Sequence, residues 1–401
     1  MTYKIKQLLL AILVVIVGGA CSHDDVVEEE PQRPTNNHTV IMYFPWSTNL
    51  YHAFQNNIKD MESAIRTYGG IDNKRLMVFV AQDVNAGCLY EIRLDNQQCV
   101  HDTLRRYTSL DFTSSQTMTR ILTDVKELVP PVTKRYSLLV GAHGMGWIPG
   151  AAWADFDIRR KKAFGVGVGN GFPEPITRFI GGLTRDVQMD IEQLADGIGN
   201  AGITFDYILF DDCYMANVET AYMLRNVTRY LVGSVGEMMA YGMPYQLIYP
   251  YLISDQLDAD AVTSSFLSFY SSYYMPYGEV SVLDCSATAD MAAIFRQLRE
   301  HYPGQPDPAE VFSFDMYDQN VFFDLCDYYE HFDTEGIARG AFEACINRLV
   351  VSKAATKRLY TSYTSQSFPL ETCCGVSTSG PTIAPSIAAA YKKTSWYLCS
   401  D

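Results

Sequence analysis

The chain has 401 residues and a formal net charge of −15. Hydrophobic residues make up 48% of it and charged residues 19%, so a large core can be buried and the chain is not a disordered protein. The acidic balance repels phosphate backbones, which excludes nucleic acid as a partner and favours basic ligands or substrates at long range.

The first twenty residues have the features of an export signal. Lys4 and Lys6 precede an apolar run, 8–17, and small residues lead to Cys21. A basic start and a short apolar core are typical of a secretory signal, and the run is too short for a membrane span. Cys21 resembles the lipidated cysteine of a bacterial lipoprotein box, and a plain cleaved signal is the alternative. We expect export and a lipid anchor at Cys21 in the cell envelope, at the outer membrane or the cell surface.

Composition divides the rest of the chain into three parts. Residues 21–37 are acidic, contain prolines and lack an apolar period, which indicates a solvated tether. We expect a core that carries the chemistry over residues 38–254. Residues 255–401 are predicted to form a mostly helical C-terminal region packed on that core.

Short apolar segments alternate with amphipathic ones along the core. Those typical of buried strands are 39–44, 76–80, 136–140, 207–210 and 230–233, with a hairpin around residue 95. Helical patterns cover 53–65, 118–128, 191–198 and 218–224. Continuous apolar strands separated by helices predict an α/β/α sandwich with a mostly parallel central sheet, and the C-terminal region adds helices.

Nine cysteines remain when Cys21 is set apart, in a compartment that permits disulfides. Cys88 and Cys99 flank the predicted hairpin, and we expect that they could pair across it. Cys373 and Cys374 are adjacent and cannot easily bridge each other. The sequence contains no Cys-x-x-Cys pair, so it gives no support for a structural zinc site, and we assign no metal ligands.

Two predicted strand ends carry residues suited to nucleophilic chemistry. The strand that ends at Val140 leads to His143 and Gly144, and the strand that ends at Phe210 leads to Cys213. Functional groups collect beyond the carboxyl ends of parallel strands. A cysteine nucleophile needs an imidazole and hydrogen-bond donors for the oxyanion. We predict Cys213 as nucleophile, His143 as general base, and the backbone amides of Gly144 and Cys213 as oxyanion hole.

The position of Cys213 after its strand predicts that it begins the following helix, where the helix dipole lowers the pKa of a thiol. Taken singly, Cys213 is as well explained as an inert buried cysteine, and His143 as a turn histidine. Their occurrence together at two strand ends favours a catalytic pair.

The two motifs resemble those of a known family. Residues 138–147, Leu-Leu-Val-Gly-Ala-His-Gly-Met-Gly-Trp, resemble the His motif of the clostripain family of cysteine peptidases. Residues 205–215 with Glu219 resemble its nucleophile motif, and residues 231–237 resemble the strand that follows. The resemblance implies a caspase-like fold, polypeptide substrates, Cys213 as nucleophile and His143 as base, with no cofactor required.

The family resemblance also implies features that vary among its members. Many cleave after arginine or lysine, and some respond to calcium. Some mature by cleavage of a loop downstream of the histidine. Here that loop would lie within residues 148–185, which contain the basic run Arg159–Lys162; a solvated basic patch is the alternative.

Asp211 is the candidate specificity residue. It lies two residues before Cys213, so strand alternation places both on one side of the sheet. Its carboxylate could pair with a basic substrate side chain or could cap a nearby turn. Asp212 stands where the family usually has alanine, and a carboxylate there opposes thiolate formation unless it is paired or points away.

Three other residues complete the set of substrate-binding candidates. Tyr241 stands near the position expected for a second pocket acid and would narrow the pocket. Ser234 belongs to the segment after the strand that follows the nucleophile. Trp147 could line a substrate cleft, and Trp46 likewise, although packing is the usual role of aromatics beside strand ends.

Two functions from different classes fit these residues. The first is an exported, lipid-anchored cysteine endopeptidase. The second is a catalytically silent relative that binds peptides or partners through the same cleft, which Asp212 and Tyr241 favour. A group of acids, Asp315, Asp318, Asp324 and Asp327, lacks the spacing of an EF-hand, so we expect solvated helix faces there.

Overall fold

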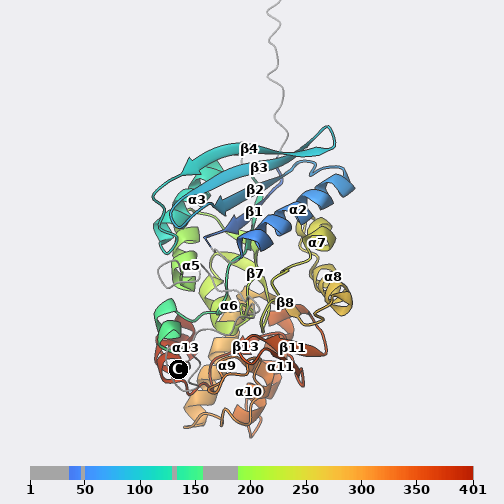
Figure 1. The fold of residues 1–401 in the computed structure, drawn as a ribbon. Coiled ribbons are helices and arrows are strands. Elements are labelled where there is room, and N and C mark those ends of the chain that lie inside the picture. Colours follow the sequence, from blue (N-terminus) through green and yellow to red (C-terminus); the bar gives the residue numbers. More distant parts are fainter. Residues whose placement is uncertain (1–35, 47–49, 129–132, 157–187, 401) are drawn as a thin grey trace, which may run out of the picture. The chain divides into compact units, whose positions relative to one another are not determined.

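A single nine-stranded sheet carries the fold in the computed structural model (Figure 1). The structure describes residues 36–46, 50–128, 133–156 and 188–400. The strand order is β10-β8-β7-β6-β5-β1-β2-β3-β4. The bounds are β1 (His38–Phe44), β2 (Lys74–Ala81), β3 (Gly87–Asp95), β4 (Gln98–Tyr107), β5 (Arg135–Val140), β6 (Phe205–Phe210), β7 (Thr228–Gly233), β8 (Glu279–Asp284) and β10 (Val350–Ala355).

The centre of the sheet is parallel and its two margins are antiparallel. Strands β2, β1, β5, β6 and β7 pair in parallel, whereas β3 and β4 at one margin and β8 and β10 at the other pair antiparallel. From β1 the chain first moves outward to β2, and later resumes on the other side of β1 at β5. The order in which strands are added to the sheet thus reverses between β1 and β5, and ligands bind at such a switch point in open α/β sheets.

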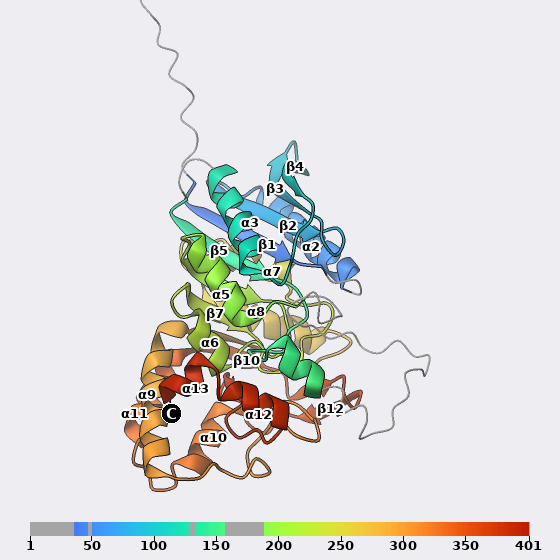
Figure 2. The same cartoon turned by 90° about the vertical axis from the view of Figure 1, so that its left-hand side faces the viewer.

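Helices cover both faces of the sheet (Figures 1 and 2). One face carries α2 (Tyr51–Tyr68), α7 (Tyr245–Leu252) and α8 (Ala259–Ser272), and the other carries α3 (Ser115–Leu128), α5 (Ile191–Asn200) and α6 (Val218–Leu224). In α2 the buried side chains Phe54, Ile58, Met61 and Ile65 recur at helical spacing, which gives the helix one apolar face for the sheet. The predicted α/β/α sandwich is confirmed.

The predicted strands and helices of the core all occur, with bounds that differ by a few residues. The prediction that residues 255–401 are mostly helical is incomplete, because β8 and β10 from this region extend the main sheet. In β8 the polar side chains of Glu279 and Ser281 interrupt the apolar pattern, yet both are fully buried. Val235 N–H and the Ser281 hydroxyl donate to the Glu279 carboxylate, which offsets the cost of burying it.

The remaining elements lie in this C-terminal region. They are η2 (Cys285–Ala287), α9 (Thr288–His301), β9 (Phe323–Asp324), α10 (Leu325–Phe332), α11 (Arg339–Leu349), β11 (Arg358–Thr361), β12 (Gln366–Pro369), β13 (Ser377–Thr378), α12 (Pro385–Tyr391) and α13 (Ser395–Ser400). Within the described ranges, no helix is both long and apolar enough to cross a membrane. The export signal, Cys21 and the run Arg159–Lys162 lie outside the described residues.

Two expectations about side chains are wrong. Cys88 and Cys99 are free thiols, because the register of the β3–β4 hairpin sets Cys88 opposite Arg106 and Cys99 opposite Leu94.

Asp315 and Asp324 do not lie on solvated helix faces. Both are buried, and their carboxylates accept backbone N–H groups. The Phe322 N–H donates to Asp315 at 2.7 Å, and the Cys374 N–H donates to Asp324 at 2.6 Å.

Candidate active site

The two strand ends that carry the predicted catalytic residues are neighbours in the sheet. β5 pairs with β6 so that Val140 lies opposite Phe210, and the Asp211 N–H donates to the Val140 carbonyl at 2.8 Å. The loops that follow hold His143 and Cys213, each 1% exposed. The parallel register therefore brings together two residues that are far apart in the sequence.

Two glycines let the histidine loop pack directly on the nucleophile turn. A Cβ atom added to Gly144 would lie 2.8 Å from the Cys213 backbone nitrogen and closer still to its carbonyl oxygen. Gly146 has φ +58°, and a Cβ there would lie 2.7 Å from the Tyr214 carbonyl oxygen. Only glycine permits this approach of two backbones, which explains the Gly-x-Gly spacing after His143.

Asp212 joins the same two loops by a hydrogen bond. The Ala142 N–H donates to its Oδ1 atom at 2.5 Å, and the side chain is fully buried. A carboxylate before the nucleophile would oppose a thiolate if it faced the sulfur without a donor. Here it accepts the Ala142 N–H of the histidine loop, so it fixes the separation of the two candidate catalytic segments.

The prediction that Cys213 begins a helix is wrong. Tyr214 has φ 58°, a conformation rare for a bulky residue, and α6 starts only at Val218 with Asn217 as its N-cap. The macrodipole of α6 therefore does not act at the sulfur, since its effect is confined to the first turn. Instead the Met238 N–H donates to Cys213 Sγ at 3.1 Å, and a donor at this place stabilises negative charge on sulfur.

The unusual conformation of Tyr214 is held by its side chain. Its ring stacks on Phe322 with centroids 4.4 Å apart, and its hydroxyl donates to Glu237 Oε1 at 3.2 Å. Phe322 belongs to a loop ordered by the Asp315 carboxylate, which accepts the N–H groups of Tyr317, Val321 and Phe322. The backbone strain at the nucleophile turn is thus supported by tertiary packing.

Glu237 is a buried carboxyl group beside this turn. Besides Tyr214, the Ser362 N–H and the Thr361 hydroxyl donate to it, at 2.9 Å and 3.1 Å. Burial outweighs these donors and raises the pKa of Glu237 to about 7. Sequence reasoning gave Glu237 no role, because Thr361 and Ser362 lie more than a hundred residues away in the chain.

A C-terminal segment links the two catalytic motifs. Trp147 donates its indole N–H to the Ser379 hydroxyl at 2.9 Å, while the Ser379 N–H and the Thr378 hydroxyl donate to Glu219 at 2.9 Å and 2.7 Å. Burial raises the pKa of Glu219 to about 7. Trp147 is buried and packs on Tyr391. Its role is therefore packing, and it does not line a cleft.

The substrate-binding candidates have defined partners. Met243 N–H donates to Asp211 Oδ1 at 2.9 Å, so one oxygen of this buried acid caps the turn that contains Gly242. The Tyr241 hydroxyl donates to Asp60 Oδ2 at 2.8 Å and its ring stacks on Phe269, which fixes it against α2 and α8. Ser234 is buried at the end of β7, and its hydroxyl accepts the Gly236 N–H.

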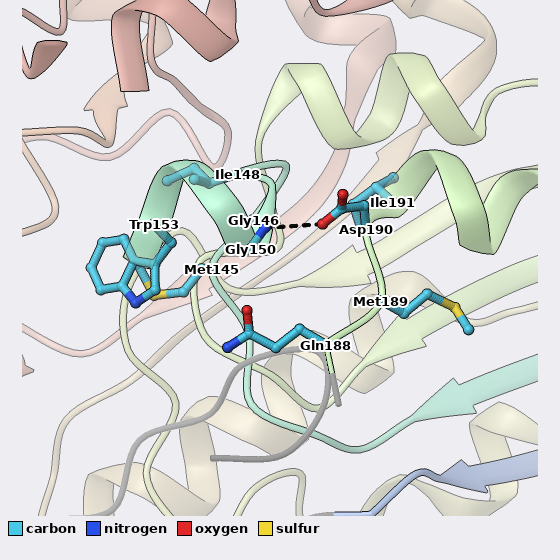
Figure 3. Close-up of a pocket in the computed structure, with 9 residues that line it drawn as sticks. All are labelled: Met145, Gly146, Ile148, Gly150, Trp153, Gln188, Met189, Asp190 and Ile191. Atoms are coloured by element: carbon cyan, nitrogen blue, oxygen red, sulfur yellow. Dashed lines mark hydrogen bonds between the residues drawn. The ribbon is translucent and has the colours of Figure 1, made fainter. Parts of the chain in front are cut away.

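A pocket lies beside the histidine loop, as Figure 3 shows. Met145 and Gly146 line it from that loop, and Gly150 and Trp153 from the segment after it. The other lining residues named here are Gln188, Met189, Asp190 and Ile191. Asp190 precedes α5 and accepts the Gly150 N–H at 3.0 Å, which holds the two described flanks of the segment 157–187 together.

The sequence profile of the clostripain family matches residues 43–366. The chain belongs to the clostripain family. It is therefore a cysteine endopeptidase by family, with the caspase-like fold of its structural neighbours. A search of curated proteins found no match.

Several solved members of the family are similar in structure. A secreted C11 cysteine protease from Bacteroides thetaiotaomicron, "iotapain", is 37% identical with a TM-score of 0.80, over 92% of this chain and 99% of that chain. A clostripain from the same organism, in complex with the peptide inhibitor BTN-VLTK-AOMK, is 39% identical with a TM-score of 0.51, over 55% of this chain and 99% of that chain. An inactive zymogen C11 protease from Parabacteroides distasonis is 24% identical with a TM-score of 0.76, over 92% and 99%, and shows the fold alone.

The contact at Gly144 predicts that Gly144→Ala removes peptidase activity. The new Cβ would meet backbone atoms, which cannot rotate away, so His143 must move from Cys213. A displacement of about 1 Å costs roughly 100-fold in kcat/KM. Hydrolysis of a fluorogenic peptide measures the loss. Gly199→Ala in α5 is the matched control, because its Cβ would lie 3.9 Å from the nearest atom. Full activity of Gly144→Ala would contradict the packing argument.

The raised pKa of Glu237 predicts stability that falls as pH rises. Between its ordinary value of 4.5 and about 7, the folded chain binds more protons than the unfolded chain, so its free energy of unfolding decreases with pH. Glu237→Gln removes this pH-dependent part of the free energy of unfolding, which is on the order of 2 kcal/mol. Urea unfolding at pH 5 and pH 7.5 measures it, with exposed Glu330→Gln as control. An equal pH dependence in Glu237→Gln and the unsubstituted chain would refute the assignment.

Proposed function

We propose that this chain is an exported, lipid-anchored cysteine endopeptidase that uses a Cys213–His143 dyad and cleaves after arginine or lysine. The main observation in support of the dyad is the packing of Gly144 on the Cys213 backbone, which holds the loop of His143 against the turn that contains Cys213. No cofactor is required in this proposal.

Each chemical step has a candidate group in the site. His143 accepts the Cys213 thiol proton, and the thiolate attacks the scissile carbonyl carbon. The Met238 N–H supports the charge on sulfur before the attack. The amides of Gly144 and Cys213 then donate to the oxyanion. His143 returns the proton to the leaving amine, and water hydrolyses the acyl-enzyme to restore the thiol.

Two observations support a preference for basic residues. Asp211 is a buried acid directly after β6, two residues before Cys213, and one of its oxygens is held in place by the Met243 N–H. The clostripain 39% identical to this chain was solved with an inhibitor whose peptide letters, VLTK, end in lysine. A buried carboxylate of fixed position suits a guanidinium or ammonium group.

A catalytically silent peptide-binding relative is the second candidate. The observation in its favour is the burial of the dyad, since His143 and Cys213 are each 1% exposed. The described pocket lies beside the histidine loop, and Cys213 is not among its lining residues. This candidate requires the same fold and the same packing of glycines, so activity has to decide between the two.

Turnover of a fluorogenic peptide library by the purified mature chain tests the peptidase. We expect cleavage after arginine or lysine, abolished in Cys213→Ala and shifted away from basic residues in Asp211→Asn, which keeps the shape but not the charge of the pocket acid. Cleavage after small residues would discard the basic pocket. Absence of turnover with calcium, without calcium and after limited proteolysis would favour the silent relative.

The anchor is tested separately from catalysis. Lys4, Lys6, the apolar run 8–17 and Cys21 support lipidation, and the 37% identical neighbour is described as secreted. In a bacterial host we expect incorporation of labelled palmitate and recovery in the membrane fraction. Cys21→Ala should abolish both, whereas Cys99→Ala should not. Unlabelled, fully released protein from the unsubstituted chain would indicate a plain cleaved signal.

A further inference from the structure

Two thiol groups meet away from the catalytic dyad. Cys326 lies in the first turn of α10, and Cys374 precedes β13. Their sulfur atoms and a carboxylate oxygen of Asp324 all lie within 4.8 Å of one another. Both cysteines are of intermediate burial.

The backbone around the two thiols is already joined. β9 and β13 pair antiparallel, with Ser377 opposite Asp324, and the Leu325 N–H donates to the Val376 carbonyl at 3.1 Å. The Cys374 N–H donates to Asp324 Oδ2 at 2.6 Å. These backbone contacts already hold the two segments together, so a bond between the sulfurs would give up only the hydrogen bond that the Cys374 thiol donates to the Val376 carbonyl at 3.1 Å.

Cys374, and not its neighbour Cys373, faces Cys326. Successive side chains of an extended segment point to opposite sides. The nearby acid Glu279 contributes to the raised pKa of Cys373, whereas a hydrogen bond with Cys326 contributes to that of Cys374, after burial in both cases. The two adjacent cysteines thus have different surroundings.

A metal ion is a poorer occupant of this cluster than a covalent bond. The Asp324 carboxylate already accepts three backbone donors, the N–H groups of Cys326 and Asp327 at 3.0 Å each and that of Cys374. A metal would have to compete with these donors for its only oxygen ligand.

We propose that Cys326 and Cys374 form a structural disulfide in the exported chain. The inference rests on the export part of the proposed function, because disulfides persist in oxidising compartments. The oxidant is a disulfide, either oxidised glutathione or a disulfide-carrying oxidoreductase. One cysteine thiolate attacks it and displaces a thiol, and the second cysteine then attacks the mixed disulfide. Two cysteine thiols lose two electrons and two protons, and the oxidant leaves as two thiols.

The bond would strengthen the support of the nucleophile turn. The loop before β9 contains Phe322, which stacks on Tyr214, and the Ser377 N–H in β13 donates to the Ala216 carbonyl at 2.9 Å. These two contacts come from the two segments that the disulfide would join. The chain would then hold an oxidised pair close behind a turn whose own cysteine, Cys213, must stay reduced.

Peptide mapping of the full exported chain tests the disulfide directly. The chain is purified without reductant from an exporting host, its free thiols are alkylated, and it is digested under non-reducing conditions. We expect a linked peptide pair containing Cys326 and Cys374 that separates on reduction with the gain of two hydrogen atoms. Reduction should also lower the Tm by roughly 3–6 °C.

Matched variants test whether the change in Tm on reduction comes from Cys326 and Cys374. In Cys326→Ser/Cys374→Ser the Tm should no longer respond to reductant, whereas Cys88→Ser/Cys99→Ser should keep the full response. Both thiols alkylated in the unsubstituted chain after incubation with oxidised glutathione would overturn the proposal. So would stoichiometric zinc that protects them from alkylation. Because mapping does not depend on turnover, a linked pair in a chain that cleaves no peptide would sustain the disulfide and refute only the peptidase.

Discussion

The close approach of two backbones is the constraint on which the site depends. A thiol and an imidazole on separate loops act together only if the loops cannot drift apart. In this chain the missing Cβ atoms of Gly144 and Gly146 allow the histidine loop to lie on residues 213–217, and the Asp212 carboxylate ties it there through the Ala142 N–H. Side-chain contacts alone would leave this distance adjustable, whereas backbone contacts do not.

The strained turn after Cys213 follows from the same constraint. Tyr214 takes a positive φ, which redirects the chain before α6 begins and leaves the sulfur facing the Met238 N–H. Strain of this kind persists only where the surroundings over-determine it. Phe322 and Glu237 supply those surroundings, and both come from outside the two catalytic loops. The C-terminal region is therefore part of the active-site architecture rather than an appended layer.

Much of the fold could be predicted from the sequence because its core strands are uninterrupted apolar runs. The rule that functional groups collect beyond parallel strand ends singled out His143 and Cys213 from the sequence, and the structure adds that their strands, β5 and β6, are paired. The predictions that failed concern features that depend on residues distant in the sequence. The strand β8 was missed because its buried Glu279 finds donors only in the folded chain. The helix predicted over 218–224 was right, but the expectation that Cys213 begins a helix was wrong, because propensity does not reveal the conformation of Tyr214.

The sequence points to candidate reacting groups but not to the residues that support them. Thr378 and Ser379 connect Glu219 to Trp147, although they belong to none of the motifs that the sequence displays. Single hydroxyl residues in a loop give no pattern that a sequence can display. Asp315 was misassigned for a related reason: its spacing from other acids suggested solvent, whereas its role is to accept three backbone N–H groups.

The supports have a chemical consequence for the whole enzyme. Burial raises the pKa values of Glu219 and Glu237 to about 7 and of Glu279 to about 8, so each loses a stabilising proton as the medium becomes neutral. A cysteine–histidine pair works best where the thiolate is populated, which is the same direction of pH. The framework behind Cys213 therefore weakens as the chemistry becomes favourable. A covalent link between Cys326 and Cys374 would offset this at the two segments that hold Tyr214 and Ala216, and it does not itself titrate.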